Sequence, residues 1–534
     1  METSLPAEKT APAVSELQAG GAETQNFQRQ MGHISRHSAV FFAGTIFTAA
    51  AGYLFKVYLA RVLGAGALGI YALGMTIVGF LGIFNALGLP QSAVRFVAAY
   101  TATAKLDLLR GFLGRSVILL LISNFLLGGA VLLLGPWIST HFYHTPALNA
   151  YLRLFALIMI LGALNTFLGQ VLAGYKDVGR RTVITNFIGS PVMMVVTLGL
   201  LTLGLGLRGY IVAQVVSAIV VLLLLLVVVW RVTPKAARSF SAGLPPYQKE
   251  VISFSAFVFG IGFLEFSMAQ ADKVLIGFYR DAREVGIYAV AAGLVTFVPI
   301  TLQTVNQIFS PTIADLYARG QNQLLGRIFR TLTKWILGLT LPLAAVMIIF
   351  ATPLMRIFGH DFERGWPVLV IGTLGQLVNC GVGSVGYLLL MSGHQSRLIR
   401  IQTVTACLMV ALSLALIPRW GIIGAAVGSA VTNAVSNVWY LREVRRTLGF
   451  FPYSRSYLRL LLPLAGGLMG LLVLRAKLGA LRPEWVVVAA SLLLAYAAFI
   501  GLALAVGLDA DDQLIARAVW SRVRGMFFGA EASA

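Results

Sequence analysis

Charged side chains are scarce in this sequence. Only 11% of its 534 residues are Asp, Glu, Lys or Arg, whereas 58% are hydrophobic, and the mean hydropathy is +0.84. A soluble globular chain carries about 25% charged residues, because its surface must be solvated. The length alone would allow several soluble domains, but this shortage of charge excludes them.

Cysteine and the motifs of enzyme chemistry are also nearly absent. Cys380 and Cys407 are the two cysteines, and both fall inside apolar runs, which argues against a disulfide framework. No Walker-type Gly-Lys-Ser/Thr loop occurs. His141 and His144 have a helical spacing, but without a third ligand nearby they are better explained as interfacial loop residues. We therefore expect no cofactor, no metal and a protein that is not an enzyme.

The net charge of +21 does not indicate a nucleic-acid partner. The basic residues stand in short clusters between long apolar runs, with no basic stripe interleaved with aromatic residues. Such clusters are typical of the cytoplasmic loops of membrane proteins. The predicted partners are therefore membrane lipid and a membrane-borne substrate, with no nucleic acid.

Long apolar runs are what the sequence does contain. A hydrocarbon core of about 30 Å needs about 20 apolar residues per helix, and barrel strands of alternating polarity are not seen. The sequence thus predicts an all-α polytopic membrane protein of about fourteen transmembrane helices. The predicted spans are 39–60, 68–90, 112–135, 152–174, 182–204, 208–230, 251–271, 285–311, 335–355, 366–392, 399–417, 421–441, 457–475 and 484–507.

The distribution of Lys and Arg predicts the orientation. With the N-terminus in the cytoplasm, the cytoplasmic segments hold most of the basic residues, whereas the outer loop 135–150 has none. This bias places both termini in the cytoplasm of a multi-pass protein, which we assign to a bacterial inner membrane.

An internal repeat divides the chain. The segment 69–72, Gly-Ile-Tyr-Ala, returns at 286–289, an offset of 217 residues. Each repeat would hold six helices, and an even number gives parallel repeats related by an axis along the membrane normal. The predicted domains are a disordered cytoplasmic tail 1–38, a six-helix lobe 39–231, a cytoplasmic linker 232–250, a six-helix lobe 251–441, two additional helices 442–507 and a cytoplasmic tail 508–534.

Three segments carry a family resemblance. They are 59–64 (LARVLG), 88–95 (GLPQSAVR) and 271–277 (ADKVLIG). With them the chain resembles the multidrug/oligosaccharidyl-lipid/polysaccharide exporter superfamily, in its polysaccharide-transporter branch of Wzx-like oligosaccharide flippases. The resemblance implies two six-helix lobes around a central cavity that opens alternately to each side. It also implies a polyprenyl-diphosphate-linked oligosaccharide as substrate, and a glycan polymerase or assembly proteins as partners.

Two alternatives remain open at this stage. A cation-coupled multidrug exporter of the same superfamily would commonly have twelve helices, so two additional helices favour the flippase. A membrane glycan polymerase or ligase would need a large outer loop with acidic residues or histidines, and the predicted outer loops are short.

Cations inside spans are the first candidate site residues, because each costs about 2.5–3.5 kcal/mol at a helix centre. Lys56 lies on a face of small or polar residues with Gly52 and Ala60, which would point into the bundle. It either binds the substrate diphosphate or extends its stem to the outer interface. Arg61 and Arg95 are either cavity cations or ordinary interfacial anchors.

Two carboxylates on the predicted helix 251–271 and its end form the second group. Glu265 and Asp272 would bind a proton or cation, or serve as counter-charges to Lys56, although Lys273 beside Asp272 suggests a helix end. Lys56 and Glu265 each lie a few residues beyond the middle of their spans. We therefore expect them at a similar depth, where opposite charges would interact across the cavity mouth.

A polar row in the span 285–311 is the third group. Gln303, Asn306 and Gln307 follow Pro299 at helical spacing. They predict a wall of hydrogen-bonding groups facing a sugar beside a kink. The alternative is contact between helices, worth about 0.6 kcal/mol per hydrogen bond.

Overall fold

The computed structural model describes residues 51–238, 247–453, 455–478, 484–507 and 512. Within these ranges the chain is almost entirely helical and contains no strand, which confirms the all-α class. The predicted tails lie outside the described residues, apart from Asp512, as does the start of the span 39–60.

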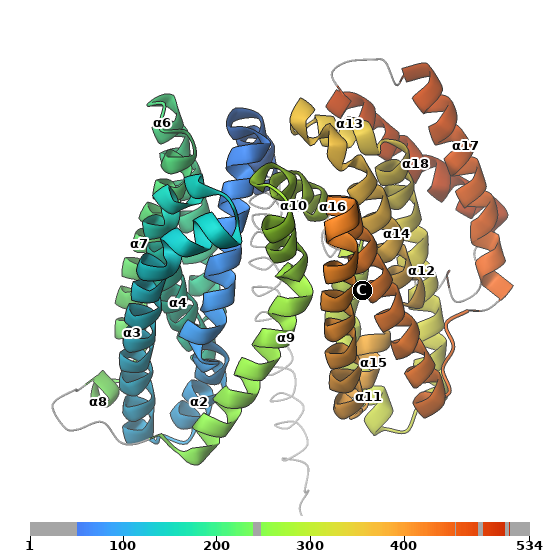
Figure 1. The fold of residues 1–534 in the computed structure, drawn as a ribbon. Helices are drawn as coiled ribbons and strands as arrows, with labels where there is room; N and C mark the ends of the chain where they lie inside the picture. The colour runs from blue at the N-terminus through green and yellow to red at the C-terminus, as the bar shows by residue number, and fades with distance from the viewer. Residues whose placement is uncertain (1–50, 239–246, 454, 479–483, 508–511, 513–534) are drawn as a thin grey trace, which may run out of the picture.

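The first group of helices, the N-lobe, comprises the described residues up to 238 (Figure 1). It begins with the helical run Ala51–Ala86. The further elements are α2 (Leu89–Ala102), α3 (Leu106–Trp137), η1 (Ile138–Phe142), η2 (Pro146–Tyr151), α4 (Leu152–Gly174), α5 (Val178–Thr182), η3 (Val183–Gly189), α6 (Ser190–Thr202), α7 (Gly206–Val232) and α8 (Lys235–Arg238).

The second group, the C-lobe, comprises residues 247–448, and α9 lies on the side that faces the N-lobe (Figure 1). Two further helices, α17 and α18, follow the C-lobe in the chain and are included in the list below. The elements are α9 (Lys249–Tyr279), α10 (Ala282–Val295), α11 (Ile300–Ala318), α12 (Asn322–Ile349), α13 (Ala351–Arg356), η4 (His360–Gly365), α14 (Trp366–Val382), α15 (Val385–Met391), α16 (Gln395–Leu448), η5 (Arg455–Leu460), α17 (Leu461–Leu478) and α18 (Glu484–Val506).

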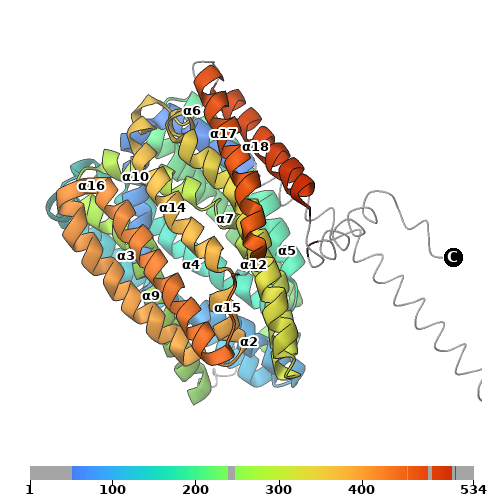
Figure 2. The ribbon, with the colours of Figure 1, turned by 90° about the vertical axis from the view of Figure 1, so that its right-hand side faces the viewer.

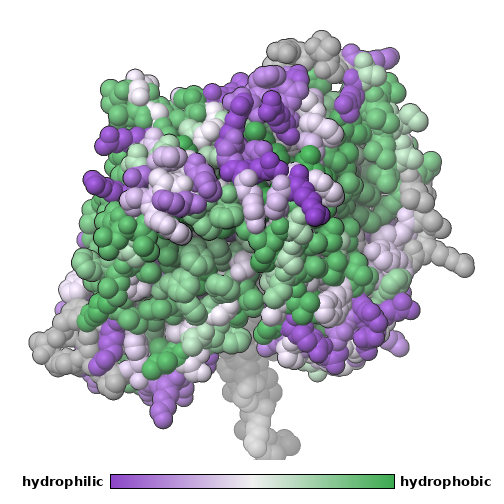
Figure 3. Space-filling model, viewed as in Figure 1, coloured by the Kyte–Doolittle hydropathy of each residue, from purple (hydrophilic) through white to green (hydrophobic). Residues whose placement is uncertain are grey.

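The surface of the molecule is that of a multi-pass membrane protein. Among the described residues, ten helices are long and apolar enough to cross a bilayer, or eleven with a bent pair counted as one span. Figure 3 shows an apolar band around the middle, with hydrophilic groups gathered toward the upper and lower margins. Phe125 and Leu133 on α3 are 81% and 82% exposed, which suits contact with lipid. The count of fourteen spans stays a prediction.

Two of the long helical runs are broken by a glycine. Gly64 has φ of 76° and Gly421 has φ of 55°, values that a right-handed helix of L-residues does not adopt. At the second break the chain reverses direction. The reversal brings Gly424 against the backbone of Leu416. The breaks fall where the hydropathy pattern separates 39–60 from 68–90 and 399–417 from 421–441.

The two lobes touch near both ends. At the upper end of Figure 1, the first helical run crosses α10 where Gly69 meets Gly286. At the lower end, α2 packs on α9. There the Ser92 and Ser255 hydroxyl oxygens are 2.7 Å apart and share a hydrogen bond. Gly88 permits this approach, since a Cβ there would lie 2.3 Å from the Ser255 carbonyl oxygen.

The last two helices lie on the outside of the C-lobe. α17 and α18 pack on each other and on α12, as Figure 2 shows. The Tyr496 hydroxyl donates a hydrogen bond to the Leu339 carbonyl oxygen at 2.9 Å, which fixes α18 against α12. This pair lies beside the C-lobe rather than between the lobes.

Candidate functional site

Two helices of the C-lobe are interrupted at the same cavity. α10 and α11 are bent by 51° at a short break that ends in Pro299. α14 stops at Gly383, whose φ is 72°, and α15 restarts after Ser384. Gly383 also lets α12 approach, because a Cβ there would lie 2.3 Å from Thr333 Oγ1. Inside a membrane, irregular backbone is tolerated only where protein buries it or where it lines a cavity.

The cavity at these breaks, which we call the C-lobe cavity, has a volume of about 400 Å³. α9, α11, α14, α15 and α16 contribute its walls. Of its lining residues in the described part of the chain, two thirds have polar side chains and none is charged. They are Met268, Pro299, Leu302, Gln303, Asn306, Gln376, Asn379, Gly383, Ser384, Gly386, Tyr387, Met409, Ser429, Thr432, Asn433, Ser436, Asn437 and Tyr440.

Hydrogen bonds within the wall hold several of its amides in place. Asn433 Nδ2 donates to the Gly375 carbonyl oxygen at 3.3 Å, and Asn437 Nδ2 donates to Asn433 Oδ1 at 2.7 Å. On α14, Asn379 Nδ2 donates to Gln376 Oε1 at 3.0 Å. The wall is therefore preorganised rather than composed of freely rotating side chains.

Three polar atoms of the cavity wall are buried and have no hydrogen-bond partner among the described residues. They are Asn306 Oδ1 on α11, Ser384 Oγ before α15 and Thr432 Oγ1 on α16. Their residues are only 8%, 2% and 3% exposed. Leaving such a group unsatisfied costs about 1–3 kcal/mol, so each needs an explanation. All three residues line one cavity, so their polar groups are candidates for hydrogen bonds to a ligand there.

The structure brings together two of the three residues predicted to face a sugar. Gln303 and Asn306 line the C-lobe cavity beside the predicted kink, whereas Gln307 is exposed and does not line it. The larger part of the wall, on α14 and α16, was not predicted from the sequence. The signal was present, since the segment 429–440 carries Ser, Thr, Asn and Tyr at helical spacing inside an apolar run.

Lys56 lines a second cavity, which we call the upper cavity, where the lobes meet. It has a volume of about 480 Å³, and Lys56 is its one charged lining residue in the described part of the chain. The Lys56 side chain is exposed. Tyr53, Tyr71 and Tyr210 contribute to the same wall. Lys56 therefore faces a cavity between the lobes.

Arg61 and Arg95 line neither cavity. Arg61 Nε donates a hydrogen bond of 2.7 Å to the Ile357 carbonyl oxygen, which joins the first helical run to the end of α13. The Arg95 guanidinium lies over the ring of Phe254 on α9, with its carbon 4.7 Å from the ring centroid. This distance suits a cation–π interaction. In this arrangement both arginines connect the two lobes.

Glu265 does not pair with Lys56 in this structure. Glu265 is exposed on α9 and takes part in no ion pair among the described residues. The two residues lie at different depths. Lys56 precedes the break at Gly64 by eight residues, about 12 Å of helix, whereas Glu265 precedes the end of α9 at Tyr279 by fourteen, about 21 Å. The expected span 251–271 was too short, so it misplaced the middle of the helix.

Asp272 lies inside α9 rather than at its end, because the helix continues to Tyr279. Its side chain is buried and accepts a hydrogen bond from the Tyr288 hydroxyl on α10. The Lys273 backbone nitrogen also lies 2.7 Å from Asp272 Oδ1. Asp272 therefore joins α9 to α10, and it lines neither cavity.

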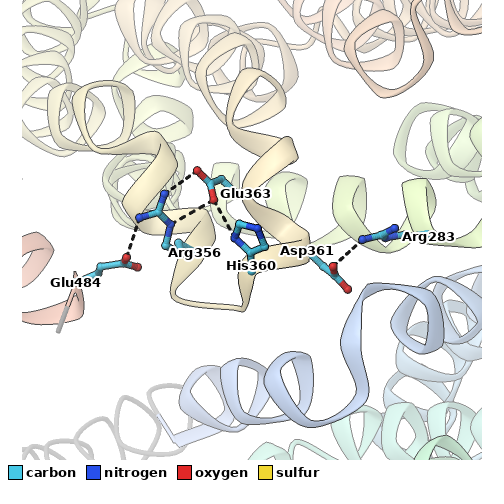
Figure 4. Close-up of polar contacts among 6 residues, drawn as sticks. All are labelled: Arg283, Arg356, His360, Asp361, Glu363 and Glu484. Carbon is cyan, nitrogen blue, oxygen red and sulfur yellow. Dashed lines mark hydrogen bonds and ion pairs between the residues drawn. The ribbon is translucent and has the colours of Figure 1, made fainter. Parts of the chain in front are cut away.

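An ionic cluster at the upper end of the C-lobe was not expected from the sequence (Figure 4). The Arg356 guanidinium donates to Glu363 at 2.7 Å and to Glu484, at the start of α18, at 3.1 Å. These hydrogen bonds, that to Glu363 above all, raise the pKa of Arg356. Beside them Arg283 pairs with Asp361 at 2.6 Å. The cluster attaches α18 to the C-lobe.

Comparison with known proteins now places the chain. Residues 58–364 match a family model described as polysaccharide biosynthesis protein. The chain belongs to the polysaccharide biosynthesis protein family. A relative of this family member is an uncharacterized membrane protein of Methanocaldococcus jannaschii, 22% identical over 413 residues, which cover 73% of this chain and 80% of the relative.

Solved structures similar to this family member show its fold. The lipid II flippase MurJ, in an inward closed conformation, is 14% identical with a TM-score of 0.64, over 87% of this chain and 97% of MurJ. An inward-facing multidrug resistance MATE transporter of the MOP superfamily is 15% identical with a TM-score of 0.63, over 74% of this chain and 94% of that chain. The fold is that of the MOP superfamily, which confirms the expected resemblance.

A third similar structure is a MOP superfamily transporter from Pyrococcus furiosus, whose binding pocket is described as having reverse polarity. It is 15% identical with a TM-score of 0.52, over 76% of this chain and 93% of that chain. Similarity of fold at this level of identity therefore does not define the substrate of this chain.

Proposed function

We propose that this polysaccharide biosynthesis family member is a flippase for a polyprenyl-diphosphate-linked oligosaccharide, working by alternating access. The observation that carries the proposal is the C-lobe cavity, whose wall is polar and uncharged inside an apolar helix bundle. A sugar-bearing head group must exchange its hydrogen bonds to water for others as it passes about 30 Å of hydrocarbon. A preorganised wall of amides and hydroxyls supplies those hydrogen bonds.

The upper cavity supplies what the C-lobe cavity lacks, a cation. Lys56 lies between the lobes, where it would attract the diphosphate of the lipid carrier. With both termini in the cytoplasm of a bacterial inner membrane, the upper end of Figure 1 would face the periplasm. The product would then be delivered to a glycan polymerase or assembly proteins on that side.

A cation-coupled multidrug exporter is the competing function. Export of cationic drugs in exchange for protons or sodium would favour a carboxylate in the cavity wall. Among their described lining residues, neither the C-lobe cavity nor the upper cavity contains Asp or Glu. This composition favours a sugar-bearing substrate.

The test is translocation by the purified protein in liposomes, without ATP. A fluorescent polyprenyl-diphosphate disaccharide is placed in the inner leaflet, and its arrival outside is followed with an impermeant quencher. Protein-containing liposomes should transfer the lipid several-fold faster than empty ones. No transfer above that background, together with gradient-driven efflux of a cationic dye, would favour the exporter.

A further inference from the structure

The wall of the C-lobe cavity carries no charged side chain among its described residues, which limits the ligands that it can accept. We propose that the cavity is a subsite for a neutral sugar unit of the transported glycan and that it disfavours acidic sugars. The proposal rests on the function proposed above in taking a lipid-linked glycan as the ligand. It adds which lobe holds the sugar and which class of sugar that lobe accepts.

The unpaired atoms of the wall define what the ligand must offer. Ser384 and Thr432 carry hydroxyl groups, which both donate and accept, whereas Asn306 Oδ1 only accepts a hydrogen bond. The ligand must therefore donate at least one hydrogen bond. A carboxylate or phosphate group only accepts and cannot satisfy Asn306 Oδ1, whereas a sugar hydroxyl both donates and accepts. Acidic sugars carry hydroxyls as well, so the discrimination against them rests on the missing counter-charges of the wall.

The absence of charge from the wall limits the ligand further. Its described lining residues include no Lys, Arg or His to pair with a uronic acid, and no Asp or Glu to pair with an amino sugar. Moving a charged group from water into such a site is unfavourable unless an opposite charge accompanies it. A neutral, hydroxyl-bearing ring meets no such penalty.

The volume of the cavity and the aromatic side chains in its wall also suit a sugar. Its volume of about 400 Å³ lies within the usual range for ligand pockets, roughly 300–1,000 Å³. Tyr387 and Tyr440 each place an aromatic ring with a polar tip in the wall. Such rings can pack against the C–H face of a sugar while the surrounding amides bond its hydroxyls.

Several polar side chains of the N-lobe already bond to other groups of the protein. There Asn85 Nδ2 donates to Asn124 Oδ1 at 2.9 Å, and Ser217 Oγ donates to the Gly189 carbonyl oxygen at 2.8 Å. Gln214 Nε2 likewise donates to the Tyr71 hydroxyl at 2.8 Å. These polar groups of the N-lobe are used within the protein. Asn165 Oδ1, also in the N-lobe, is buried without a hydrogen-bond partner among the described residues but lines neither the C-lobe cavity nor the upper cavity. We therefore assign the sugar subsite to the C-lobe, where three such atoms belong to one cavity wall.

Binding to protein in lipid nanodiscs tests the proposal with three probes. They are a polyprenyl diphosphate carrying N-acetylglucosamine, the same lipid carrying glucuronic acid, and the same lipid without a sugar. The wild type should bind the first at least about tenfold more tightly than the other two. Ser384→Ala and Thr432→Val should each reduce that advantage roughly threefold to tenfold, the effect of one lost hydrogen bond. Affinity for the sugar-free lipid should not change.

Ser413→Ala is the matched control, because Ser413 on α16 also has a buried, unpaired hydroxyl but does not line the cavity. It should bind all three lipids as the wild type does. If the acidic and neutral glycolipids bind equally, or if Ser384→Ala and Thr432→Val keep the full sugar advantage, the subsite is refuted while the flippase proposal stands. If none of the three lipids binds, the proposed function itself fails, and the subsite with it.

Discussion

Gly69 and Gly286, at equivalent positions of the internal repeat, lie against each other where the two lobes meet. A Cβ on Gly69 would lie 1.5 Å from the Ala282 carbonyl oxygen, and one on Gly286 would lie 2.1 Å from the Ala65 carbonyl oxygen. Ala65 and Ala282 are themselves separated by the repeat offset of 217 residues. The contact is therefore self-complementary, as a two-fold relation between parallel repeats requires.

Replacing either Gly69 or Gly286 by alanine should separate the two helices where they cross. In both cases the obstacle is backbone, which cannot rotate away, so Gly69→Ala and Gly286→Ala should each destabilise this lobe arrangement by about 1–3 kcal/mol. Spin-label distances between the upper ends of the lobes should increase. Gly66→Ala is the control, because a Cβ there meets nothing within 4 Å. Unchanged distances in both variants would show that the crossing does not hold the lobes together.

Removing the charge of Lys56 should slow transport. Lys56 is the one charged residue that lines the upper cavity in the described chain, so Lys56→Met leaves no cation there for the diphosphate. We expect at least about a tenfold lower rate of glycolipid transfer, since a charge-assisted hydrogen bond contributes about 1.5–3 kcal/mol. Lys56→Arg keeps the charge and should retain much of the rate. A wild-type rate in Lys56→Met would mean that Lys56 only reaches toward the membrane interface.

Removing the Tyr288 hydroxyl should weaken the junction of α9 and α10. Tyr288→Phe leaves the buried Asp272 without that donor, which should cost about 1–3 kcal/mol of unfolding free energy. Thermal unfolding in detergent should show a lower midpoint than for Tyr58→Phe, since Tyr58 is 39% exposed. Equal midpoints for the two variants would indicate that Asp272 is not stabilised through Tyr288.

The ionic cluster of Figure 4 should hold the start of α18. Arg356→Gln removes the charge between Glu363 and Glu484, so backbone hydrogen exchange near Glu484 should become faster. Arg283→Gln breaks the neighbouring pair with Asp361 and does not touch α18, so exchange there should stay at the wild-type rate. The prediction fails if both variants exchange alike at α18.

Hydropathy predicted the helical class and the recurrence of Gly-Ile-Tyr-Ala predicted the repeat, because both depend on residue patterns along one chain. Pro299 likewise placed Gln303 and Asn306 beside a kink, since proline interrupts a helix whatever surrounds it. The expected pairing of Lys56 with Glu265 is not seen in the structure. That expectation depended on knowing where each helix ends, and α9 extends eight residues beyond the predicted span. The α16 wall was missed since small polar residues in an apolar run equally suit helix packing.

The most direct test of the account is the rate at which liposomes containing the protein transfer a polyprenyl diphosphate carrying N-acetylglucosamine. The wild type and Ser413→Ala should transfer it without ATP, well above empty liposomes. The double variant Ser384→Ala/Thr432→Val should be slower by roughly tenfold or more, because two hydrogen bonds to the sugar are lost. Equal rates for the double variant and the wild type would contradict the role of the C-lobe cavity, and a wild-type rate no faster than empty liposomes would contradict the flippase itself.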